Sequence, residues 1–110
     1  MTNSRVNEES VPSYWLGTYK MLTTCFPESL PSDDYFPIIR VLSEWNSEGA
    51  VSDIMMMCGF GEHYVIVESD FIKVISGQVK VSDEELERTI SKLMLHGYDA
   101  WLDEMRTSPL

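Results

Sequence analysis

The residues in this chain of 110 amino acids that could ligate a metal are two cysteines and two histidines: Cys25, Cys58, His63 and His96. Structural zinc sites use ligands at close spacing, such as two cysteines separated by two residues, so that one turn presents both. Only Cys58 and His63 are close in the chain, with four residues between them. The spacing therefore argues against a metal site, and the sequence predicts no metal and no other cofactor.

The two cysteines are also poor candidates for a catalytic nucleophile. A reactive thiol needs electropositive surroundings that lower its pKa. Both cysteines fall near the expected C-terminal ends of helices, where the partial negative charge has the opposite effect. The first ten residues contain no apolar signal-peptide core, so we expect a cytoplasmic protein with two free thiols rather than a disulfide.

Carboxylates cluster at residues 33–34 and 83–85. Two neighbouring carboxylates can perform acid–base catalysis when one is buried and its pKa rises. Both clusters, however, stand where helices are expected to begin. There, Asp33 or Asp34 would accept free backbone amides as a cap, and Ser82-Asp83-Glu84-Glu85 has the pattern of a capping box. The sequence therefore predicts no catalytic residue and favours a non-enzymatic protein.

The spacing of apolar residues predicts the helices that must position these groups. Helices are expected at about 13–26, 34–45, 48–58, 70–76 and 83–96, bounded by prolines, caps and glycines. The β-branched segments 63–67 and 78–81 could pair as a minor two-stranded ribbon. The predicted fold is thus all-α, a single compact bundle of about five helices. Residues 12–105 form its domain, with a disordered tail at 1–11 and a second tail at 106–110.

The charge of the chain restricts its partners. Its 18 acidic and 8 basic residues give a formal net charge of −10. Nucleic-acid and membrane-surface binders need a basic patch, so neither partner is expected. No apolar run approaches the ~20 residues of a membrane helix. A protein partner, especially a basic one, and a homo-oligomer both remain compatible with this composition.

Several short motifs follow one another along the chain: Phe26-Pro27-Glu28, Pro31-Ser32-Asp33-Asp34-Tyr35-Phe36-Pro37, Ser69-Asp70-Phe71-Ile72, Ser82-Asp83-Glu84-Glu85 and Gly97-Tyr98. In this order they resemble a family of small, uncharacterised, all-helical proteins from mycobacteria and related actinobacteria, a domain of unknown function. The chain departs from that pattern at Val81 and after Gly97, where the family tends to have prolines. The resemblance implies a bundle of about five helices, and it brings no catalytic residues.

The methionine run at residues 55–57 indicates a binding surface. Consecutive residues on a helix point about 100° apart, so Met56 or Met57 should lie near the surface unless the helix is buried on two sides. Exposed methionines suit adaptable protein-binding surfaces. Our leading hypothesis is a small acidic protein-interaction module with a partner surface at Met56, Met57, Phe60 and Tyr64.

The alternative hypothesis is a small-ligand-binding protein or an enzyme with a pocket between the central helices. Such a pocket needs polar groups that converge in an apolar cleft. The residues that could line it are Tyr35, His63, Tyr64 and His96.

Overall fold

The computed structural model describes residues 5–107, and this range contains six α-helices and one 3-10 helix. Their bounds are η1 Glu8–Ser10, α1 Ser13–Cys25, α2 Ser32–Ser43, α3 Glu48–Met57, α4 Tyr64–Ile75, α5 Asp83–Met94 and α6 Tyr98–Thr107. The Cα radius of gyration of 12.9 Å agrees with the ~13 Å expected for a compact domain of this length. The all-α, compact part of the prediction is confirmed.

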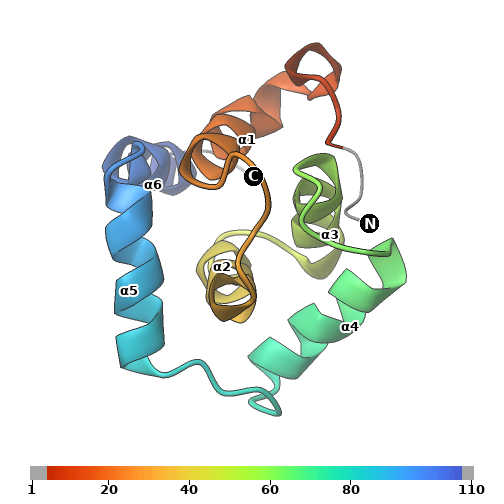
Figure 1. The fold of residues 1–110 in the computed structure, drawn as a ribbon, viewed down its shortest axis with the longest axis vertical. Helices are drawn as coiled ribbons and strands as arrows, with labels where there is room; N and C mark the ends of the chain where they lie inside the picture. The colour runs from red at the N-terminus through yellow and green to blue at the C-terminus, as the bar shows by residue number, and fades with distance from the viewer. Residues whose placement is uncertain (1–4, 108–110) are drawn as a thin grey trace.

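Helix α2 is the centre of the fold, and α1, α3, α4 and α5 are arranged around it (Figure 1). Its side chains Ile38, Ile39 and Leu42 are fully buried. These positions follow the helical repeat on a face broad enough to contact neighbours on several sides. Helix α6 packs against α1 and α5 and completes the bundle.

Local sequence signals mark both ends of α5. Ser82 Oγ accepts a hydrogen bond from the Glu85 amide at 3.1 Å, and the Glu85 carboxylate accepts one from the Ser82 amide at 3.3 Å. The predicted capping box is therefore present. Gly97, which follows α5, has a φ of +91° that other residues rarely adopt, and this turn allows α6 to begin at once.

The beginning of α2 differs from the prediction. The helix starts at Ser32, after Pro31, and no side chain caps it. Neither Asp33 nor Asp34 is the cap, and both lie in the first turn. Pro37 consequently lies beyond that turn, inside the helix, where it has no N–H to donate.

The predicted ribbon is wrong, since residues 5–107 contain no strand. Residues 64–67 form the first turn of α4, and residues 78–81 lie in the irregular connection to α5. Val67 is fully buried and begins a stripe that continues through Phe71 and Val74 at steps of four and three residues. Burial of this stripe against α2 and α3 overrides the β preference of the valines and isoleucine.

The bundle also extends further along the chain at both ends than predicted. Arg5 donates to the carbonyl oxygens of Phe26, Pro27 and Cys58, and the Val6 amide donates to Met57 O at 3.1 Å. These contacts attach the described part of the predicted N-terminal tail to the bundle. At the other end, residues 98–107 form a full helix, α6, which includes two residues of the predicted C-terminal tail. The remainder of both predicted tails, residues 1–4 and 108–110, lies outside the described residues.

No helix within residues 5–107 combines the length and the apolar character needed to cross a membrane.

Candidate functional site

The two cysteines and two histidines that were weighed as metal ligands or nucleophiles stand at the ends of different helices. Cys25 ends α1, Cys58 follows α3, His63 precedes α4 and His96 follows α5. Among residues 5–107, no group of three or more histidine, cysteine or acidic residues is placed to hold a metal ion. Both thiols are free. Burial raises the pKa of Cys58 to about 12 although the charge of Arg5 lowers it, so its reactive thiolate is disfavoured.

A buried polar cluster joins α2 to α5. The Asp34 carboxylate is 0% exposed and accepts hydrogen bonds from Thr89 Oγ1 at 2.6 Å and Lys92 Nζ at 2.7 Å. Cys25 lies near this cluster. Burial, and secondarily the negative charge of Asp34, raise the pKa of its thiol. The two hydrogen bonds engage the Asp34 carboxylate, and the raised pKa disfavours the thiolate of Cys25. The cluster therefore joins α2 and α5.

Tyr35 makes a second polar contact between helices. Its hydroxyl on α2 donates to Asp70 Oδ2 on α4 at 2.7 Å. Burial and then this hydrogen bond raise the pKa of Tyr35. The bond fixes α4 against α2. Tyr35 was predicted to line a pocket with His63, Tyr64 and His96, but none of these four residues lines the cavity described next.

The cavity is a cleft of about 720 Å³ between the start of α1, the α2–α3 connection, α3 and the end of α6. Aromatic side chains and carboxylates form most of its wall, which consists of Tyr14, Trp15, Glu44, Trp45, Asn46, Ala50, Asp53, Glu104, Met105 and Arg106. Its volume lies in the range of roughly 300–1,000 Å³ typical of ligand pockets. We refer to it below as the aromatic–acidic cleft.

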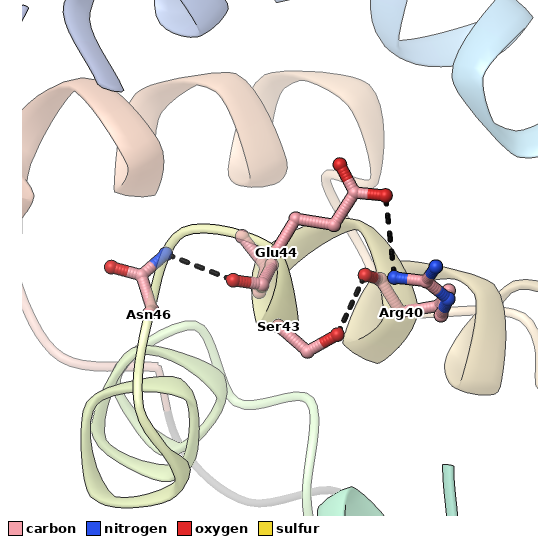
Figure 2. Close-up of polar contacts among 5 residues, drawn as sticks. Arg40, Ser43, Glu44 and Asn46 are labelled. Carbon is pink, nitrogen blue, oxygen red and sulfur yellow. Dashed lines mark hydrogen bonds and ion pairs between the residues drawn. The ribbon is translucent and has the colours of Figure 1, made fainter. Parts of the chain in front are cut away.

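The C-terminal end of α2 positions one wall of the aromatic–acidic cleft. Figure 2 shows the polar contacts at this end of the helix. Ser43 Oγ donates to Arg40 O at 2.8 Å, and Asn46 Nδ2 donates to Leu42 O at 3.1 Å, so side chains satisfy the last carbonyls of the helix. Glu44 forms an ion pair with Arg40 at 3.3 Å, one turn earlier. The polypeptide leaves the helix here, which brings Glu44 and Trp45 to the cleft.

A second exposed feature is the outward face of α4, which we define as Val65, Ile72 and Ile75. Val65 is 71% exposed, Ile72 46% and Ile75 56%. Ile66 is also exposed, but it stands nine positions before Ile75 and therefore lies on the opposite side of the helix from it. Val65 and Ile72 are seven residues apart, so they lie on the same side of the helix two turns apart. That side is opposite the buried stripe that begins at Val67.

The predicted partner surface divides between the core and the exterior. Phe60 is 7% exposed and belongs to the core, where its ring meets Phe26 edge-on at 6.1 Å between centroids. Met56 and Met57 are partly buried against the core, and Tyr64 is exposed at the start of α4. Sequence reasoning missed Val65 and Ile72. Their spacing of seven residues is the signal that indicates a shared helix face, but Val65 falls in the segment 63–67 predicted as extended and Ile72 falls in the separate predicted helix 70–76.

No protein-family model, no curated protein and no solved structure matches this chain.

Proposed function

We propose that this protein is a small, non-enzymatic protein-interaction module that binds its partner through the outward face of α4. The observation that carries the proposal is the group of large apolar side chains left exposed on that face. Contiguous apolar residues on the surface of a folded domain mark interaction sites more often than isolated ones do.

The arrangement of α4 supports this proposal. One side of the helix packs against α2 and α3, and Val67, Phe71 and Val74 are buried there. The other side carries Val65 and Ile72, with Glu68 and Ser69 between them, whereas a solvent-facing helix surface is ordinarily polar throughout. In Figure 1, α4 lies at the edge of the bundle, with α2 and α3 to one side of it. A helix that is apolar on both sides is stabilised when a partner covers the second side.

The charges beside this face indicate the chemistry of the partner. Partial desolvation, followed by the negative charges of Asp53, Glu68 and Glu48, raises the pKa of Tyr64 at the start of α4. The apolar face is therefore bordered by carboxylates at this end, in a chain of net charge −10. We infer a partner that presents an apolar surface bordered by basic residues, since complementary charges accelerate and orient such encounters.

Paired affinity enrichments from native lysate test this function. The bait is the wild-type chain, the double variant V65E/I72E, or the control M94E/L95E, which places the same two charges on exposed apolar residues at the end of α5. A protein enriched by the wild type and by M94E/L95E, but lost with V65E/I72E, supports the proposal. Circular dichroism must show that all three baits are folded. If enrichment is the same for all three baits, the outward face of α4 is not the binding surface.

A further inference from the structure

We propose that the aromatic–acidic cleft is a binding site for an organic cation, specifically the guanidinium of an arginine side chain in a bound peptide. This inference does not rest on the apolar residues of the outward face of α4, because none of them lines the cleft. Asp53 lines the cleft, and its charge also acts on Tyr64 at the start of α4.

The aromatic walls of the cleft are accessible. Tyr14 is 64% exposed and Trp45 is 39% exposed, whereas Trp15 is buried beneath them. Trp45 follows α2, which ends at Ser43, and its side chain lines the cleft. Exposed aromatic faces attract cations through their π electrons, and tryptophan does so most strongly.

The charge of the cleft has the matching sign. Three carboxylates from three elements line it, Glu44 after α2, Asp53 on α3 and Glu104 on α6. Arg106 is the basic residue among the lining side chains, so the lining carries a formal charge of −2. The Arg40–Glu44 ion pair engages one carboxylate, but both side chains are about half exposed, and such surface pairs are weak and exchangeable.

The size and composition of the cleft distinguish between kinds of cation. A metal ion needs several ligands in one small cage, and within residues 5–107 no three histidine, cysteine or acidic side chains are placed to provide one. A volume of about 720 Å³ instead admits a long side chain with part of its backbone. Guanidinium stacks on aromatic rings and forms paired hydrogen bonds with carboxylates, so arginine suits this combination better than lysine does.

An NMR titration of the full chain tests the site. The probe is the blocked peptide acetyl-Gly-Arg-Gly-amide, and the uncharged control replaces arginine by citrulline. We expect the indole N–H signals of Trp15 and Trp45 to shift and saturate with the arginine peptide, while that of Trp101, which is buried and bonded to Thr18, stays in place. The citrulline peptide should cause no saturable shift up to about 10 mM, a concentration above the range of specific weak binding.

Matched variants distinguish specific binding in the cleft from nonspecific attraction to the negative charge of the whole protein. D53N/E104Q removes two lining carboxylates and should weaken binding at least about fivefold, and W45A should weaken it about tenfold. E87Q/D103N removes two exposed carboxylates outside the cleft, and V65E/I72E changes only the outward face of α4. Both should bind the arginine peptide as the wild type does, which keeps this test independent of the proposed partner surface.

Several results would overturn the inference. Equal binding of the citrulline peptide would show that charge is not recognised, and equal weakening by E87Q/D103N would show that only net charge matters. A second titration uses agmatine, which carries the same guanidinium group without a peptide backbone. If agmatine binds as tightly as the peptide, the occupant is a small free cation and the peptide assignment is wrong.

Discussion

The buried carboxylate of Asp34 has a structural role, because its hydrogen bonds join two helices. Its carboxylate lies in the first turn of α2, where the helix dipole favours negative charge. It also receives hydrogen bonds from Thr89 and Lys92 on α5, so its buried oxygens are satisfied. Thr89 and Lys92 in turn depend on Asp34 as their acceptor, and the Thr89 hydroxyl is itself buried. Removal of Asp34 would therefore leave the buried Thr89 hydroxyl without its hydrogen-bond acceptor and Lys92 without its ion-pair partner.

We predict that Asp34→Ala lowers the free energy of unfolding by about 2–4 kcal/mol, because it leaves a buried hydroxyl without its acceptor and breaks an ion pair at the α2–α5 contact. Lys92 is partly exposed and can recover water, which limits the loss. Urea unfolding followed by circular dichroism measures it. The control is Asp33→Ala, which removes the neighbouring exposed acid and should cost less than about 1 kcal/mol. Similar losses in the two variants would contradict this account.

At the scale of elements, the sequence predicted those features that depend on local signals. The capping box of α5 and the glycine after it need only a few neighbouring residues, and both are present. The segment 63–67 has β-branched residues that favour a strand locally. Only the contact of Val67 with other helices makes it helical, and this contact is not visible in the sequence. Tertiary packing therefore determines that the first turn of α4 is helical, whereas hydrogen bonds between neighbouring residues determine where α5 begins.

The α3–α4 junction provides a test of this packing. A Cβ atom at Gly61 would lie 2.5 Å from Val67 Cγ2 and 3.3 Å from Met56 Sδ. Gly61→Ala should therefore destabilise the protein by about 1–3 kcal/mol through overpacking. The comparison is Gly49→Ala in the first turn of α3, whose new Cβ would meet only the Tyr64 hydroxyl at an ordinary 3.5 Å. It should be neutral, or stabilising by up to about 1 kcal/mol.

A double-mutant cycle identifies the cause of the Gly61→Ala effect. In a Val67→Ala background the clashing methyl group is absent, so adding Gly61→Ala should cost less than it does in the wild type. Thermal unfolding of the four proteins gives the coupling energy. If the cost of Gly61→Ala is the same in both backgrounds, the backbone of the junction is responsible and the contact with Val67 is not.

At the scale of the whole molecule, the aromatic–acidic cleft could not be predicted because its walls come from distant parts of the chain. Tyr14, Asp53 and Glu104 have no shared pattern in the sequence, and they meet only once α1, α3 and α6 are packed. The last helix predicted from the sequence ends at residue 96, so the wall that α6 contributes was absent from the prediction. The acidic composition, by contrast, is visible in the sequence, and it favours the approach of positively charged ligands over negatively charged ones.

The same composition predicts how stability depends on salt. With a net charge of −10 on a molecule of 35 × 32 × 26 Å, most carboxylates repel one another across distances that salt can screen. The Debye length falls from ~30 Å at 0.01 M to ~10 Å at 0.1 M, so this repulsion weakens strongly over that range. We expect the midpoint of thermal unfolding to rise by about 3–6 °C, which corresponds to roughly 1 kcal/mol. Differential scanning calorimetry measures the change.

The variant E87K/D103K provides the control for this salt effect, because it changes two exposed acids to lysine and reduces the net charge to −6. Its unfolding midpoint should be higher than that of the wild type at 0.01 M, and it should gain less from added salt. The opposing contribution comes from ion pairs, such as Arg40–Glu44, which salt weakens. Such exposed pairs are individually worth less than about 1 kcal/mol, so general repulsion should dominate. A midpoint that falls with salt would show instead that the attractive pairs determine the electrostatic stability of this fold.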